Sequence, residues 1–172
     1  MQDQISAEVV EQTWQRIAMT PLQQAGGLIA QMQQEQPYLM DYLMAVDELL
    51  MQHEREIIFY VGMVLWQMMR QSPRGLKQVT PTHLEQAQTT NYEKLTQLAT
   101  EGDRDFEISV REAINTYPEP EVLRYMVEAI NEEDETSGPS IRDLYRGVAF
   151  IHLKSALDAM IASLEHPPPG FD

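Results

Sequence analysis

The chain has 172 residues, of which 43% are hydrophobic and 23% charged, and its formal net charge is -15. This length corresponds to one domain and is sufficient to bury a core without disulfides or metals. The absence of cysteine excludes disulfide frameworks, thiolate metal sites and cysteine nucleophiles. The negative charge argues against nucleic-acid binding, because that binding depends on Lys and Arg side chains that neutralise phosphates.

No targeting or membrane-spanning segment is evident in the sequence. Residues 1–10 lack the basic and apolar regions of a signal peptide. The longest apolar stretch, Ile57–Trp66, has ten residues, whereas a membrane span needs roughly 20. We therefore expect a cytoplasmic protein that has no membrane partner.

The start of the chain predicts two helices. Ser6 is a favourable N-cap residue, and apolar side chains then recur on one helical face to about Ala18. Thr20-Pro21 opens a second helix, to about Gln34, because proline is favoured in a first turn. Gly26-Gly27 lies in the middle of this helix, where each glycine costs about 1 kcal/mol relative to alanine. Either the helix breaks there or another helix packs closely on the two glycines, and we favour close packing.

The segment from about Tyr38 to Gln71 is the most hydrophobic part of the chain. Tyr38–Met51 and Ile57–Met69 are apolar almost all round, which is typical of helices that are buried on most sides. The polar residues 52–56 link these two parts, either as an exposed turn of one continuous helix or as a kink. The methionines of this segment suit an irregular core, and they also suit a groove that adapts to protein partners.

The rest of the chain predicts further helices separated by Pro- and Gly-containing turns. These helices run from Thr80-Pro81 to about Thr100, through Phe106 and Ile114, over Glu121–Asn131, and from Pro139-Ser140 to about Leu164. An acidic loop, Glu132–Glu135, precedes the last helix. We therefore predict an all-α helical bundle of six to seven helices over residues 1–166, followed by a Pro-rich extended tail over residues 167–172.

Two parts of the sequence resemble each other. The residues that follow Pro37 align with those that follow Pro120, and Tyr60-Val-Gly62 aligns with Tyr145-Arg-Gly147, at offsets of 83 and 85. This pattern indicates a helix-turn-helix unit used twice about a pseudo-two-fold axis, with both glycines allowing helices to approach closely. Chance similarity between helix-forming sequences is the alternative.

Metal-binding motifs are absent around the two histidines of interest. A di-iron bundle needs Glu-x-x-His on two helices, but Leu50 precedes His53 and Ala149 precedes His152 at that spacing. Both histidines continue apolar helix faces, so they are either hydrogen-bonded core residues or members of a carboxylate–imidazole site. The carboxylates that could join such a site are Glu48, Glu56 and Asp158.

Other catalytic signatures are also missing. The acidic loop Glu132–Glu135 lacks the order of ligands in an EF-hand, and Gly26-Gly27 is not followed by the Lys of a phosphate-binding loop. We therefore predict no metal and no cofactor, and we assign no catalytic residues.

These observations favour a non-enzymatic protein that acts through protein–protein contacts, as an adaptor, a chaperone-like protein or a regulator. A homodimer is the expected assembly, because a long segment that is apolar nearly all round is hard to bury in one small bundle. The alternative is a small helical enzyme that binds a metal or a substrate through His53, His152 and nearby carboxylates.

Overall fold

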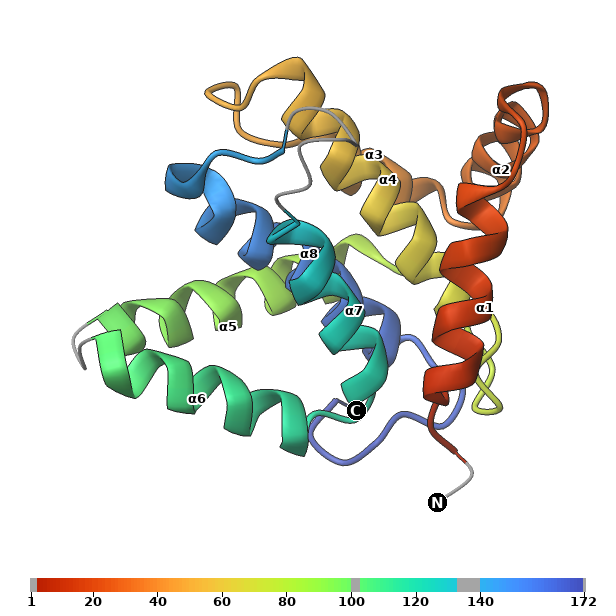
Figure 1. Ribbon diagram of the computed structural model, residues 1–172. Helices are drawn as coiled ribbons and strands as arrows, with labels where there is room; N and C mark the ends of the chain where they lie inside the picture. Colours follow the sequence, from red (N-terminus) through yellow and green to blue (C-terminus); the bar gives the residue numbers. More distant parts are fainter. Residues whose placement is uncertain (1–2, 100–102, 133–139, 172) are drawn as a thin grey trace.

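Eight helices make up the computed structural model, which describes residues 3–99, 103–132 and 140–171 (Figure 1). The predicted all-α single-domain fold is confirmed for these residues, with eight helices in place of six to seven. In chain order the helices are α1 (Ala7–Ala18), α2 (Leu22–Glu35), α3 (Pro37–Met44), α4 (Gln52–Met69), α5 (Pro81–Ala99), α6 (Asp103–Thr116), α7 (Pro120–Ile130) and α8 (Asp143–Ala162).

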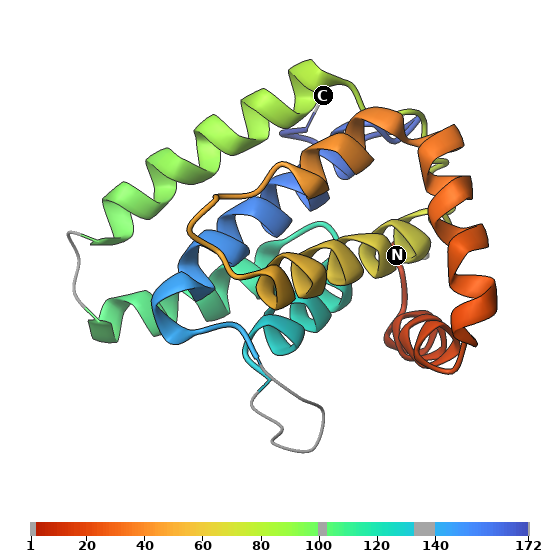
Figure 2. The same cartoon turned by 90° about the horizontal axis from the view of Figure 1, so that it is seen from above.

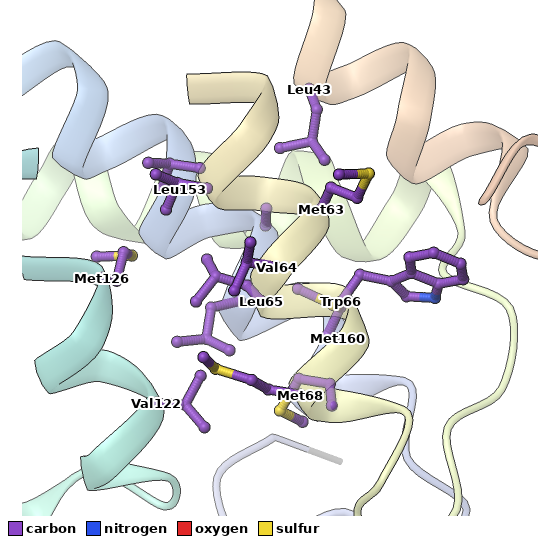
Figure 3. Close-up of a cluster of buried hydrophobic side chains, with 14 of the residues drawn as sticks. Leu43, Met63, Val64, Leu65, Trp66, Met68, Val122, Met126, Leu153 and Met160 are labelled. Carbon is purple, nitrogen blue, oxygen red and sulfur yellow. The ribbon is translucent and has the colours of Figure 1, made fainter. Parts of the chain in front are cut away.

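Helices α4 and α8 form the centre of the molecule (Figure 2). α4 packs against α1, α3, α7 and α8, and α8 also packs against α3 and α5. Every residue from Val61 to Met69 is buried, because neighbouring helices surround that part of α4 on all sides. Figure 3 shows this packing, in which Met68 of α4 lies among side chains that include Val122 of α7. The methionines Met63, Met68 and Met69 are therefore core residues.

The hydrophobic segment from Tyr38 to Gln71 is two helices with a loop at residues 45–51. The chain is not one continuous helix here, because the break lies at residues 45–51, but residues 52–56 are helical, as one of our two alternatives had it, and form the first turn of α4. The reason is a capping contact: the Glu54 carboxylate accepts a hydrogen bond of 2.8 Å from the N–H of Met51. A helix start leaves such N–H groups without helical partners, and a glutamate at the third position satisfies one of them.

Glu54 also joins the start of α4 to the start of α8. Its fully buried carboxylate accepts hydrogen bonds from the Arg142 N–H at 2.9 Å and from the Arg142 guanidinium at 2.8 Å. Burial alone would raise the pKa of Glu54, but the hydrogen bonds from Arg142 and Met51 outweigh it and lower this pKa to about 2. Because Arg142 is held in an extended conformation, α8 begins at Asp143 and not at Pro139-Ser140, where we had predicted its start.

Helix α2 runs unbroken through Gly26-Gly27, and nothing lies within 4 Å of a Cβ built at either glycine. Both explanations that we considered, a helix break and the close packing of another helix, are therefore wrong. The glycines are exposed positions in a regular helix.

We expect Gly26→Ala and Gly27→Ala each to raise the free energy of unfolding by about 1 kcal/mol, because alanine is the better helix former and meets no neighbour here. Together they should raise the midpoint of thermal unfolding by about 4–8 °C. Circular dichroism melting of the two single variants and the double variant measures this. A lower midpoint for the double variant would contradict the prediction.

The two similar sequence segments occupy corresponding places in the fold. Pro37 begins α3 and Pro120 begins α7, and α4 and α8 follow them. The contacts also correspond, because α3 packs on α8 and α7 packs on α4 across the central α4–α8 contact. Close approach occurs at only one of the two glycines: a Cβ at Gly62 would lie 2.5 Å from Leu43, whereas one at Gly147 meets nothing within 4 Å.

The acidic residues 133–135 lie outside the described part of the chain, and Glu132 is exposed. Beyond α8, the residues of the tail that the structure describes, 167–171, form no helix, and the Phe171 N–H donates to the Pro168 carbonyl at 3.1 Å. Among the described helices, none combines the length and the hydrophobicity needed to cross a membrane.

Candidate functional site

The structure places the two candidate histidines in separate environments. His53 lies in the first turn of α4, with its Nε2 at 3.2 Å from the carbonyl oxygen of Ser140. His152 lies in α8 with 7% of its surface exposed, and its ring stacks on Tyr42 of α3 with the ring centroids 4.2 Å apart. Over residues 3–99, 103–132 and 140–171 no three His, Cys, Asp or Glu side chains are grouped so that they could hold a metal ion. A carboxylate–imidazole site therefore gains no support.

Burial determines the protonation of the stacked pair. It lowers the pKa of His152 to about 4, against weaker opposing hydrogen bonds to the backbone. It raises the pKa of Tyr42 to about 12, and the nearby Ser155 hydroxyl only partly opposes this. Both rings are thus neutral at pH 7, and protonating His152 would place a charge in the contact between α3 and α8.

We expect the free energy of unfolding to decrease as the pH falls from about 6.5 toward 4, because in this range the unfolded chain binds a proton at His152 that the folded chain does not. One pKa unit corresponds to about 1.4 kcal/mol, so His152 should contribute a loss of about 1.4 kcal/mol between pH 7.5 and 5.5. Urea denaturation at these two pH values measures the loss. His152→Phe, which keeps a ring against Tyr42, should abolish this contribution.

His166→Phe is the matched control, because His166 is exposed and outside α8. This variant should keep the pH dependence of the wild-type protein. An equal pH dependence in the wild type and in His152→Phe would show that His152 is not the group responsible.

A cavity of about 720 Å³ lies between α5, α6, α7 and α8. In Figure 1, α5 and α6 lie close together at one end and diverge toward α7 and α8. α6 makes its main contacts with α5 and α7, so these helices enclose space on one side of α8. The walls are mainly apolar, and the side chains that form them include Leu95, Ala113, Ile114, Leu123, Val127, Ile130, Phe150 and Ile151.

Four polar side chains form a connected network on the wall of this cavity. Asp158 of α8 accepts a hydrogen bond from the Tyr117 hydroxyl on one carboxylate oxygen. Its other oxygen accepts from Lys154 Nζ and from Asn91 Nδ2, each at 2.9 Å. Lys154 Nζ also donates to the side-chain amide oxygen of Asn91, Oδ1, at 3.0 Å. We call Asn91, Tyr117, Lys154 and Asp158 the polar cluster.

The polar cluster is largely removed from water, and its charges balance. The side chains of Lys154 and Asp158 are only 12% and 11% exposed, so each charge depends on its partners to offset the cost of desolvation. Burial raises the pKa of Tyr117 well above 10, and the Asp158 charge raises it further. Tyr117 therefore remains protonated and donates to Asp158. The cluster holds α5 against α8 and places polar groups at one point of an apolar cavity.

Sequence reasoning identified little of this site. It named Asp158 only as a possible neighbour of the histidines, and it missed Asn91, Tyr117 and Lys154. One signal was present: Lys154 and Asp158 are the two charged residues of a mainly apolar run and stand one helical turn apart, a spacing that places them side by side. Asn91 and Tyr117 carry no such signal, because they are 63 and 41 residues away from the partners that they contact.

Comparison of the chain with protein-family models, with curated proteins and with solved structures found no match.

Proposed function

We propose that this protein binds a small, mainly apolar organic molecule in the cavity between α5, α6, α7 and α8. The observation that carries the proposal is the combination of a volume of about 720 Å³ with apolar walls and one cluster of polar side chains. Ligand sites in proteins are typically concave, about 300–1,000 Å³ in volume and mostly apolar, with a few polar groups that orient the ligand.

The hydrogen bonding of the polar cluster favours binding over catalysis. A general base needs an atom that is available to take a proton from the substrate. Both oxygens of Asp158 already accept hydrogen bonds, one of them from the Tyr117 hydroxyl, which remains protonated. The cluster therefore offers a fixed polar surface to a bound molecule, and our proposal retains the expectation of a non-enzymatic protein.

A neutral fluorescent probe, N-phenyl-1-naphthylamine, tests the proposal. Its emission increases in an apolar environment, and its lack of charge avoids repulsion by a protein of net charge -15. We expect saturable binding with one site per chain to the folded protein. Binding that does not saturate would contradict the proposal.

The variant Gly147→Trp tests whether the probe binds in this cavity. Gly147 lines the cavity, and a Cβ there meets nothing within 4 Å, so an indole at this position should occupy part of the cavity and obstruct the probe without a clash near the backbone. This variant should abolish probe binding. Gly26→Trp is the matched control, because Gly26 has the same open surroundings in α2, which contributes no residue to the cavity. Equal probe binding by both variants would overturn the proposal.

A second candidate function is association with another protein, most simply a second copy of this chain. Met44, Leu49 and Met51 flank or lie in the loop between α3 and α4 and are 61%, 68% and 49% exposed. Leu144 is also exposed, and it lies near this loop because the neighbouring Arg142 donates to the Leu49 carbonyl at 3.1 Å. Exposed apolar side chains that gather in one place favour a protein contact. Such a contact would agree with the homodimer predicted from the sequence.

Sedimentation velocity distinguishes this candidate. If the loop joins two copies, the wild-type protein should sediment as a dimer and Leu49→Lys as a monomer, because a charge would be buried in the contact. A monomeric wild-type protein would exclude the homodimer.

A further inference from the structure

The residues that follow α8 bring an aromatic side chain to the edge of the cavity. The chain is held as far as His166, since the Glu165 N–H donates to the Gly75 carbonyl at 2.8 Å and Arg74 donates to the His166 carbonyl at 2.8 Å. Residues 167–171 then turn back toward α6 and α7. Gly170, whose φ of 93° suits glycine, precedes Phe171, and both residues line the cavity. We call residues 167–171 the arm.

Phe171 meets Tyr117 in a specific geometry. The two rings are nearly perpendicular, at 86°, with their centroids 6.3 Å apart. Edge-to-face pairs of this kind are favourable beyond the apolar area that they bury. The Tyr117 ring also makes a cation–π contact with Lys154, whose Nζ lies 5.3 Å from the centroid of that ring. Tyr117 therefore offers an aromatic surface for contact, and the charge of Lys154 polarises its ring.

Apart from this ring pair, the arm is held by apolar burial, chiefly of Pro168, and not by hydrogen bonds to the rest of the described fold. Within the described residues, its one hydrogen bond lies inside the arm, from the Phe171 N–H to the Pro168 carbonyl. Its proline residues lack N–H donors altogether. The position of Phe171 thus depends on apolar contact and on the ring pair with Tyr117. A molecule that makes the same contacts with Tyr117 can replace the Phe171 ring without breaking a hydrogen bond to the rest of the fold.

We infer that Tyr117 forms the centre of a subsite for an aromatic ring, and that Phe171 occupies this subsite when no ligand is bound. This inference rests on the proposed function, and it adds the class of ligand: a small molecule with an apolar aromatic ring. The ring of the ligand packs on Tyr117 in place of Phe171, and the rest of the ligand extends along the apolar wall formed by α6 and α7. Phe171 then acts as an intramolecular competitor that lowers the apparent affinity.

Removal of the competing ring tests the inference. We expect Phe171→Ala to bind N-phenyl-1-naphthylamine at least threefold more tightly than the wild-type protein, because the apparent dissociation constant falls as the open fraction rises. Phe171→Trp keeps a ring in the subsite and should show no such gain. An affinity gain below threefold for Phe171→Ala, or a loss, would overturn the inference.

Two further readouts address the subsite directly. Benzyl alcohol should displace the probe at a concentration roughly two- to tenfold lower than cyclohexylmethanol, which has the same carbon skeleton and hydroxyl group but a saturated, puckered ring. In the wild-type protein, saturating probe should also abolish the nuclear Overhauser effect between the rings of Phe171 and Tyr117. Equal displacement by the two alcohols, or an effect that persists at saturation, would contradict an aromatic subsite.

Gly147→Trp separates this inference from the proposed function. If this variant loses probe binding while Phe171→Ala gains no affinity, the cavity binds the probe and the aromatic subsite is wrong. If Gly147→Trp binds the probe as the wild type does, the cavity is not the binding site, and both proposals fail.

Discussion

Asp158→Leu is expected to lower the free energy of unfolding by about 3–5 kcal/mol, because it leaves the Lys154 ammonium buried without its carboxylate. The substitution also removes the acceptor of the hydrogen bonds from Tyr117 and Asn91. Buried donors that lose their acceptor keep the full cost of their desolvation. Urea denaturation at pH 7 measures the change.

A double-mutant cycle shows whether the loss comes from the charge pair. Lys154→Met combined with Asp158→Leu removes both charges, so the double variant should be more stable than the sum of the single changes predicts, by about 2 kcal/mol. Lys94→Met serves as the control for the loss of a lysine, because Lys94 also borders the cavity but is exposed. It should change stability by less than about 0.5 kcal/mol. Additive effects of the two single substitutions would refute the proposed coupling.

Gly62→Val is the second substitution with a large expected effect, a loss of about 3 kcal/mol in the free energy of unfolding. A Cβ at this position would lie 2.5 Å and 2.7 Å from the two terminal carbons of Leu43, which is fully buried and cannot move without disturbing the core. Overpacking of this kind costs about 1–3 kcal/mol per site, and valine adds two further methyl groups beyond the Cβ. Thermal and urea denaturation both measure the loss.

Gly147→Val is the matched control, because it makes the same change at the corresponding position of the second similar segment. Nothing lies within 4 Å of its Cβ, so this variant should be at least as stable as the wild-type protein. Leu43→Ala should compensate in part for Gly62→Val, since it removes the atoms that clash. Equal destabilisation at Gly62 and Gly147 would show that loss of glycine itself, and not close packing, is the cause.

The all-α fold followed from local signals that the sequence contains in full. Prolines in first turns begin α3, α5 and α7, and the Ser6 side chain caps α1 by accepting a hydrogen bond from the Val9 N–H. The segment Ile57–Met69 also carries its own evidence of burial, because side chains that are apolar all round need neighbours on every side. Such features depend on residues within a few positions of one another.

The ends of the central helices depended on contacts between distant residues. The sequence allowed a continuous helix or a kink at residues 52–56, but the break lies at residues 45–51, and Glu54 in the first turn of α4 binds Arg142, 88 residues further along the chain. Close packing was expected at Gly26-Gly27, Gly62 and Gly147, yet only Gly62 meets a neighbouring side chain. A glycine in a helix has the same local pattern whether or not another helix approaches it.

The sequence by itself thus determined the helical class, the exclusion of cysteine chemistry and the burial of most of Ile57–Met69, because composition and periodicity carry these properties. The same signal in Tyr38–Met51 was misleading, because Met44, Leu49 and Met51 are exposed. Only the tertiary structure decided where the cavity lies and that Asn91, Tyr117, Lys154 and Asp158 meet on its wall. The physical reason is that hydrogen bonds and ring contacts join atoms that are close in space. Because these residues are far apart along the chain, their contact produces no periodic pattern in the sequence from which it could be predicted.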